Sequence, residues 1–163
     1  GRSVDRRDRL RRRLDARKIM GNLEIKIAET SAEVGRCFPV MCQLRPHFTE
    51  SDFLEQVERQ SSQSGFRLVY LSVDDEVKAA GGIRIAEWLA GGKALEIEDL
   101  VAEDGERSKG YGGKLFDWIV DYAIQISCDQ VKLVSAVTRH GAHRFYLSKR
   151  MSIEGYYLSL PLK

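Results

Sequence analysis

A glycine-rich turn between an apolar strand and an amphipathic helix constrains this chain more than any other stretch of its sequence. The segment E-R-S-K-G-Y-G-G-K, residues 106–114, places three glycines and three basic residues within nine positions. Glycine lets the backbone turn tightly and lets another molecule approach it without a Cβ in the way. The free N–H groups and the dipole of a helix N-terminus favour an anion there. The pattern predicts a phosphate-binding loop between a strand at 93–101 and a helix at 112–127.

Three known phosphate-binding patterns can be compared with this loop. A Walker loop, with two glycines four residues apart before Lys-Ser/Thr, is absent, and residues 110–115 lack the last glycine of a G-x-G-x-x-G fingerprint. The pattern R/Q-x-x-G-x-G/A fits at Arg107, Gly110 and Gly112. This stretch resembles the pyrophosphate-binding motif of the GNAT (Gcn5-related) N-acetyltransferases, which bind acetyl-CoA. The alternative is an ordinary glycine-rich β–α turn with solvated basic residues.

The resemblance implies a set of residues that contact acetyl-CoA. In the loop and the first helical turn these are Arg107, Ser108, Lys109, Gly110, Tyr111, Gly112, Gly113 and Lys114. In the GNAT fold the strand before the loop and the strand after its helix splay apart, and the gap admits the pantetheine arm. Carried onto this sequence, the backbone that pairs with the arm is Asp99, Leu100 and Val101.

The order of predicted elements is β-α-α-β-β-β-α-β-α-β. Alternating or apolar runs predict strands at 23–28, 66–73, 77–86, 93–101 and 153–160, and a short buried strand V-K-L-V within 129–136. Thr30 or Ser31 can cap the first helix, and Pro39 is expected to kink or restart it. The second helix begins at Thr49, and Gly65 closes it. The fold class is α/β (α+β): a mixed, mostly antiparallel central sheet with helices on both faces, in the GNAT order over residues 23–160.

Near the end of the chain, residues 139–146 match a second GNAT pattern, N-x-x-A-x-x-x-Y followed by glycine and an aromatic. Ala142 and Tyr146 are in register, whereas Arg139 stands in place of Asn and Arg150-Met151 in place of Gly-Phe. The resemblance implies that the residue at position 139 contacts the cofactor arm and that Tyr146 protonates the departing thiolate. A phenol with a pKa of about 10 can exchange a proton with a thiol.

The acids of the strand before the loop are candidates for the base that deprotonates the attacking amine. Glu98 and Asp99 are adjacent and would face opposite ways in a regular strand, but a β-bulge would let both reach one cleft. The I-E-D-L-V sequence resembles the same strand in polyamine and glucosamine-phosphate acetyltransferases, where these acids lie beside the acetyl group. Separately, Gly81-Gly82 within the strand at 77–86 indicates a bulge in that strand or a close approach of another backbone.

Acceptor specificity is expected from residues 37–53, where Arg45 and His47 are candidate substrate contacts. That region favours neither a polycation nor an anion. The three histidines do not stand at a metal-site spacing with a supporting acid, so we expect no metal.

Composition separates the chain into two parts. Residues 1–19 carry a net charge of +6 within a total of +2, which leaves −4 for residues 20–163. We therefore expect an Arg-rich appendage at 1–19 and a single domain at 20–163 whose acidic charge makes nucleic acid an unlikely partner. The sequence has no apolar run long enough to span a membrane, and three cysteines without a C-x-x-C motif indicate reduced thiols in a cytoplasmic protein.

The leading hypothesis is an acetyl-CoA-dependent N-acetyltransferase that acetylates a primary amine of a small molecule or protein. Two alternatives remain open. The first is a non-catalytic acyl-CoA-binding module or sensor, motivated by the replacements at 139 and 150–151. The second is a nucleic-acid-associated protein acting through the Arg-rich arm. A homodimer is left open as well.

Overall fold

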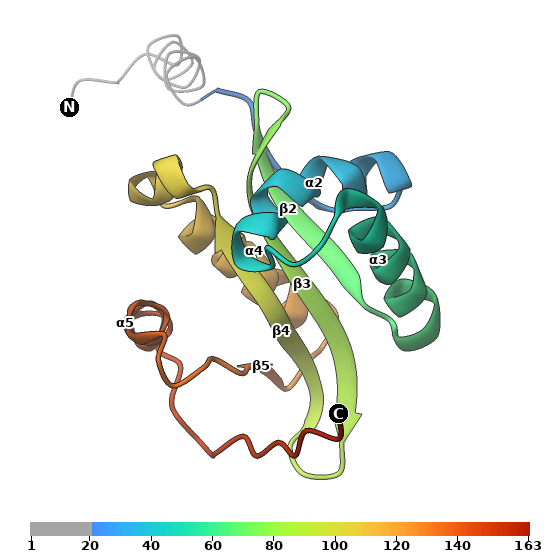
Figure 1. The fold of residues 1–163 in the computed structure, drawn as a ribbon. Coiled ribbons are helices and arrows are strands. Elements are labelled where there is room, and N and C mark those ends of the chain that lie inside the picture. Colours follow the sequence, from blue (N-terminus) through green and yellow to red (C-terminus); the bar gives the residue numbers. More distant parts are fainter. Residues whose placement is uncertain (1–20) are drawn as a thin grey trace, which may run out of the picture.

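The computed structural model describes residues 21–163, apart from the side chains of residues 106–108. The Arg-rich appendage predicted at 1–19 therefore lies outside the described residues. Figure 1 shows a twisted central sheet with helices on both faces and the C-terminal segment running along one end of it.

The elements follow the predicted order up to the last helix. Their bounds are β1 Leu23–Ile27, α2 Ser31–Leu44, α3 Glu50–Ser64, β2 Arg67–Val73, β3 Glu76–Trp88, β4 Gly92–Ala102, the 3₁₀-helix η1 Asp104–Lys109, α4 Tyr111–Gln125, β5 Gln130–Leu133 and α5 His140–Ser148. None of the helices in residues 21–163 is long and apolar enough to cross a membrane.

Five strands form the sheet in the order β1-β2-β3-β4-β5. The first four are antiparallel neighbours, and β5 runs parallel to β4 after the crossover through α4. Asp74 and Asp75 both adopt positive φ angles in the tight turn between β2 and β3, which suits the twist of a hairpin. The meander and the single parallel strand agree with the predicted mixed sheet.

Each face of the sheet carries its own hydrophobic core. On one face, α2 and α3 pack on a cluster that includes Phe53, Leu68 and Tyr70. On the other face, α4 packs Leu115 and Ile119 against the strands. Successive side chains of β2 point to opposite faces of the sheet, so this strand contributes to both clusters. Leu68 and Tyr70 belong to the first cluster, whereas Val69 and Leu71 belong to the second.

The helix starts follow their sequence signals. Thr30 forms a capping box with Glu33, whose carboxylate accepts hydrogen bonds from the N–H groups of Glu29 and Thr30. Thr49 caps α3, and Gly65 ends that helix in the left-handed conformation. The restart expected at Pro39 is wrong, since α2 continues through that residue.

The last predicted strand, at 153–160, is wrong in the described structure. Residues 149–163 contain no helix or strand, and the sheet ends at β5. A strand needs a hydrogen-bonding neighbour, and the segment runs past the end of the sheet without pairing (Figure 1). Strand β5 is short, as predicted, but it is half-buried and not buried, because its outer edge has no neighbouring strand among residues 21–163.

Candidate active site

Strand β4 contains the predicted bulge at its two candidate acids. Gly82 of β3 pairs with Asp99 and Ile83 pairs with Ile97, so Glu98 is the extra residue. Ile97 and Leu100, on either side of the acids, pack into the α4 cluster, while Val101 packs into the α2–α3 cluster. Both acids therefore lie on the face of the sheet that α2 and α3 cover.

The two glycines opposite this bulge make room for it. A Cβ on Gly82 would lie 2.5 Å from the ring of Phe66 and 3.1 Å from the carboxylate of Asp99. A Cβ on Gly81 would lie 3.0 Å from the carbonyl oxygen of Asp99. These separations are shorter than ordinary contacts. The close approach inferred from Gly81-Gly82 is thus present, and Asp99 is the residue that approaches.

Each acid is held by an arginine from a different element. Arg45, at the end of α2, donates from Nε to Asp99 Oδ1 at 2.8 Å, and its Nη2 lies 2.6 Å from the same oxygen. The Asp99 side chain is 14% exposed and that of Arg45 is 47% exposed, so the guanidinium covers the carboxylate from the solvent side.

Arg84 of β3 forms the corresponding ion pair with Glu98. It donates from Nη2 to Glu98 Oε2 at 3.3 Å and also contacts Oε1 through Nε. Its Nη1 donates to the carbonyl oxygen of Ser64 at 2.9 Å, which ties the end of α3 to the same pair. The hydrogen bond that Arg84 donates to Glu98 raises the pKa of Arg84. The sequence analysis did not single out Arg84, although its place on the strand opposite the acids could have indicated it.

Strands β4 and β5 part beside these acids. Their parallel pairing runs from Ala94 with Gln130 to Ile97 with Leu133, whereas β4 continues to Ala102. The backbone of Leu100 and Val101 therefore has no strand partner on the β5 side within residues 21–163. This is the gap that the resemblance implies.

The glycine-rich loop follows directly at the end of β4. Gly110 is the N-cap of α4 with a φ of 74°, and no described side chain caps this helix. A Cβ on Gly110 would meet none of the described atoms within 4 Å, so the backbone is open to an approaching group. The first intrahelical bond runs from the N–H of Lys114 to the carbonyl of Gly110, which leaves the N–H groups of 111–113 without an intrahelical acceptor. These features fit a phosphate group.

Gly113 has a packing role in addition to its place in the predicted phosphate-binding loop. A Cβ on Gly113 would lie 3.6 Å from Nζ of Lys149 and 3.9 Å from the ring of Phe145, so this glycine faces α5. Its small size allows α4 and α5 to approach each other. The side chains of Arg107 and Ser108 lie outside the described part of the chain, and their contacts with acetyl-CoA stay predictions.

Tyr146 lies on α5, which packs against the first half of α4. Its ring centroid is 6.1 Å from that of Phe116, and Lys149 of the same helix donates to Asp117 Oδ1 at 2.7 Å. Burial raises the pKa of Tyr146; the charge of Arg139 lowers it, and that of Asp99 raises it. Tyr146 is therefore protonated at neutral pH. Arg139 and Asp99, the two charged groups that act on this hydroxyl, are themselves predicted site residues.

Ser135 is a residue of this region that the sequence analysis missed. It lies two residues beyond the last residue of β5, where that strand has left β4. Its Oγ is buried and has no hydrogen-bond partner in the described part of the chain. A buried hydroxyl without a partner is costly, at about 1–3 kcal/mol, so a ligand group that completes its hydrogen bonding is expected there. No sequence pattern signals such a serine, because its burial depends on the packing around it.

Within residues 21–163, none of the three histidines forms a hydrogen bond or ring contact with Glu98, Asp99 or Tyr146. The His47 ring contacts that of Phe48 at a centroid distance of 4.3 Å, tilted by 38°, and its side chain is exposed. His143 Nε2 lies 2.9 Å from the carbonyl oxygen of Ala136.

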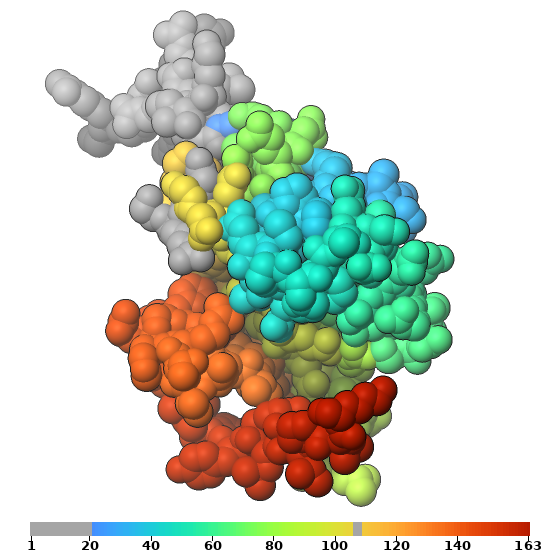
Figure 2. Space-filling view, in the orientation of Figure 1, coloured from blue at the N-terminus to red at the C-terminus, as the bar shows by residue number. Residues whose placement is uncertain are grey.

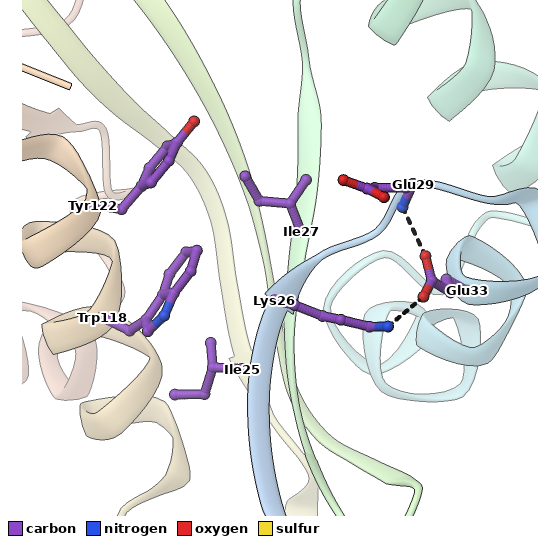
Figure 3. Close-up of a pocket in the computed structure, with 7 residues that line it drawn as sticks. All are labelled: Ile25, Lys26, Ile27, Glu29, Glu33, Trp118 and Tyr122. Carbon is purple, nitrogen blue, oxygen red and sulfur yellow. Dashed lines mark hydrogen bonds and ion pairs between the residues drawn. The ribbon is translucent and has the colours of Figure 1, made fainter. Parts of the chain in front are cut away.

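Hollows elsewhere on the surface involve other residues. One of about 300 Å³ lies between the free edge of β1 and α4, where Ile25 and Ile27 face the stacked rings of Trp118 and Tyr122 (Figure 3). On its other side Lys26 forms an ion pair with Glu33 and, with the backbone N–H groups of Glu29 and Thr30, lowers the pKa of Glu33 to about 2. That carboxylate already has its partners in the capping box. None of the predicted site residues lines this hollow.

Thiol and metal chemistry have little support in residues 21–163. Burial raises the pKa of Cys37 to about 12, so its thiol stays protonated. The described residues contain no group of three or more His, Cys, Asp or Glu side chains that could hold a metal ion.

This geometry belongs to a known family of enzymes. The sequence model of the Acetyltransferase (GNAT) family matches residues 29–151, which include β4, the loop and α5. The chain therefore belongs to the GNAT family of N-acetyltransferases.

Individual relatives agree with this assignment. The chain is 30% identical over 141 residues to an uncharacterized N-acetyltransferase, YhdJ, of Bacillus subtilis, covering 86% of this chain and 99% of that protein. A transcriptional regulator from Bacillus halodurans has the same fold, with a TM-score of 0.75 and 16% identity over 86% of this chain and 100% of the other. Glucosamine-6-phosphate N-acetyltransferase from Arabidopsis thaliana matches with a TM-score of 0.68 and 22% identity, over 87% and 99% of the two chains.

Proposed function

We propose that this protein transfers the acetyl group of acetyl-CoA to a primary amine in the gap between β4 and β5. The observation that carries this proposal is the parting of β4 from β5 beside the bulged acids Glu98 and Asp99, just ahead of the glycine-rich N-terminus of α4. A carboxylate at this gap and the protonated phenol of Tyr146 suit a reaction in which an amine loses a proton and a thiolate gains one.

The chain offers three sets of groups for acetyl-CoA. The uncapped N-terminus of α4, with Gly110, Tyr111 and Gly112, suits the pyrophosphate. The free backbone of Leu100 and Val101 suits the amides of the pantetheine arm. The buried hydroxyl of Ser135 supplies one further hydrogen bond near the same strands. Arg107, Ser108, Lys109, Lys114 and Arg139 complete the proposed binding set from the sequence motifs.

The proposed reaction is a direct attack. The acceptor ammonium loses a proton to a carboxylate of β4, for which Asp99 is the first candidate and Glu98 the second. The free amine then forms the new N–C bond at the thioester carbon, and the C–S bond breaks. Tyr146 donates its phenolic proton to the departing thiolate. The second proton, which the acceptor nitrogen releases as the amide forms, restores the phenol through solvent.

The arginines paired with Glu98 and Asp99 also affect which class of acceptor amine the site would favour. Glu98 and Asp99 are each neutralised by a guanidinium, so this surface does not present the excess negative charge that a polycation would need. An acceptor ammonium can replace Arg45 as the partner of Asp99, which frees the exposed guanidinium to bind an anionic group of the same acceptor. We therefore place an amine that also carries a carboxylate or phosphate ahead of a polyamine, with Arg45 and His47 as the substrate contacts.

A thiol-release assay tests this function on polyamines, amino acids, amino sugars, their phosphates and lysine peptides. Tyr146→Phe should lower kcat by about 100-fold or more while leaving the KM for acetyl-CoA nearly unchanged, because the hydroxyl acts on the leaving group. Tyr122→Phe is the matched control, since that tyrosine belongs to α4 and lines the hollow beside β1. Absence of turnover with every amine class would contradict the proposal.

One observation favours a second candidate, a non-catalytic acyl-CoA-binding module. Both carboxylates already hold arginine partners, and a protein that only binds acyl-CoA has no need of a free base. Tight CoA binding without turnover would favour this function. Asp99→Asn separates the two functions, because it should abolish turnover in an enzyme and leave CoA affinity unchanged in either case.

A further inference from the structure

The sheet face that holds the candidate acids continues beyond them as a row of charged side chains. Glu96 of β4 pairs with Arg84 of β3 on one side and with Lys132 of β5 on the other. The residues before and after Glu96 and Lys132 along their strands pack into the α4 cluster, so these two side chains point to the opposite face. Arg84 lies on that opposite face as well, since it holds Glu98. The row therefore adjoins the acids on one surface.

Lys132, at the end of this row, contacts an aromatic ring. Its Nζ lies 4.5 Å from the ring centroid of Trp88, near the end of β3. Glu96 is its direct neighbour on β4, yet no described carboxylate forms an ion pair with this ammonium group. The Trp88 side chain is 52% exposed, so the pair is accessible from solvent. An ammonium group held over an indole ring, with no carboxylate partner, is suited to bind an anionic group of a ligand.

Helices α2 and α3 leave this part of the face uncovered. Among the described residues, their cluster takes Val101 from the end of β4 and nothing from the first half of that strand. Between the charged row and Trp88, the side chains on this face are those of Ala86 and Ala94, which pair across β3 and β4. Figure 2 shows yellow-green strand atoms between the cyan-to-green α2–α3 region and the red C-terminal segment. An extended ligand can therefore lie along this face from the acids to Trp88.

We propose that Lys132 and Trp88 form the far end of the acceptor site and bind the carboxylate of a long acceptor amine. Because β4 rises about 3.3 Å per residue, Glu96 and its neighbour Lys132 lie roughly 7–10 Å along the strand from Glu98 and Asp99. The acceptor is thus an amine whose carboxylate lies about 8–12 Å from the reacting nitrogen, such as 8-aminooctanoate or a tripeptide. This inference rests on the proposed function and specifies its acceptor.

Arg45 and Lys132 then serve acceptors of different lengths. Arg45 forms an ion pair with Asp99 itself, so it reaches an anionic group only when that group is close to the reacting amine. Lys132 reaches an anionic group at the other end of the charged row. The chain length of the acceptor therefore separates the contributions of the two cations.

A thiol-release assay on ω-amino acids of increasing length, from β-alanine to 8-aminooctanoate, tests this specificity. The parent should have a kcat/KM for 8-aminooctanoate at least 10-fold above that for β-alanine. Lys132→Met should remove this preference, mainly through a KM for 8-aminooctanoate that is about 10- to 100-fold higher, because a charge-assisted contact is lost. Lys132→Arg is the matched control, since it keeps the charge and should keep most of the preference.

Two failures of this assay have different meanings. Absence of turnover with every amine class contradicts the proposed function itself. Turnover of the ω-amino acids with the same length dependence in the parent and in Lys132→Met leaves the proposed function standing and overturns the assignment of Lys132.

Binding at the far end of the site can also be measured without turnover. Trp88 is the single tryptophan left in a Trp118→Phe chain, because the protein has two. In the presence of CoA, 8-aminooctanoate should change the fluorescence of Trp88 saturably, and Lys132→Met in this background should raise the Kd at least 10-fold. Octylamine, which lacks the carboxylate, should bind at least 10-fold more weakly than 8-aminooctanoate. A fluorescence that does not respond, or equal Kd values for the two ligands, overturns the proposal.

Discussion

Ser135 is the residue whose surroundings most clearly call for a ligand. Its buried hydroxyl has no partner in the described structure, and it follows β5 at the gap where β4 also loses its neighbour. Asp99 and Glu98 differ from Ser135, because each of these carboxylates forms an ion pair with an arginine. Motif matching readily found the acids and Tyr146. It could not find Ser135 or Arg84, whose significance lies in burial and in contacts across strands.

Ser135→Ala should have opposite effects on the free and the CoA-bound protein. Removal of an unpaired buried hydroxyl should stabilise the free protein by about 1 kcal/mol, which raises Tm by about 2–4 °C. Loss of a hydrogen bond to the ligand should weaken CoA binding about 5–10-fold. Melting curves and calorimetric titrations measure the two effects.

Ser61→Ala, at an exposed serine of α3, is the control and should leave CoA affinity unchanged. If Ser135→Ala leaves CoA affinity unchanged as well, the hydroxyl is not part of the binding site.

Helix α5 shows how an element can keep its geometry after its sequence departs from the family pattern. Arg150, in the position where the pattern has glycine, adopts a φ of 67°. The N–H of Arg150 donates to the carbonyl of Leu147, and that of Met151 donates to the carbonyl of Tyr146, which together form a Schellman motif. Met151 packs where the pattern has an aromatic residue. The end of the helix that carries Tyr146 is thus preserved.

Arg150→Gly should stabilise the protein. Glycine relieves the strain of the left-handed conformation, about 1–2 kcal/mol, against an entropic cost in the unfolded chain of about 0.4–1 kcal/mol. We expect a net gain of about 0.5–1 kcal/mol in urea unfolding. Lys149→Gly, one residue earlier at a φ of −84°, relieves no strain and loses the ion pair with Asp117, so it should destabilise the protein. Equal effects of the two substitutions would rule out the strain argument.

At the scale of the whole molecule, local sequence signals predicted most of the helices and strands. The prediction failed where a strand depends on pairing with a segment distant in the sequence. Thr30, Thr49 and Gly65 marked helix ends correctly, and Gly81-Gly82 indicated a close approach of another backbone, which is that of Asp99. The strand at 153–160 failed because its sequence specifies an extended strand but not its partner. Alternation alone cannot say whether the neighbour is β5 of the same copy, β5 of another copy or absent.

The central claim, that CoA binds at the uncapped N-terminus of α4 beside the gap, is tested most directly by calorimetric CoA titration of Gly112→Val. A Cβ at Gly112 would lie 3.7 Å from Cβ of Ala102, an ordinary contact, so the variant should fold. Its branched side chain should block the approach of the pyrophosphate and weaken CoA binding about 10- to 100-fold. Gly35→Val, within α2 and also in ordinary contact, should bind CoA like the parent. If Gly112→Val binds CoA as tightly as the parent does, the site has been placed wrongly.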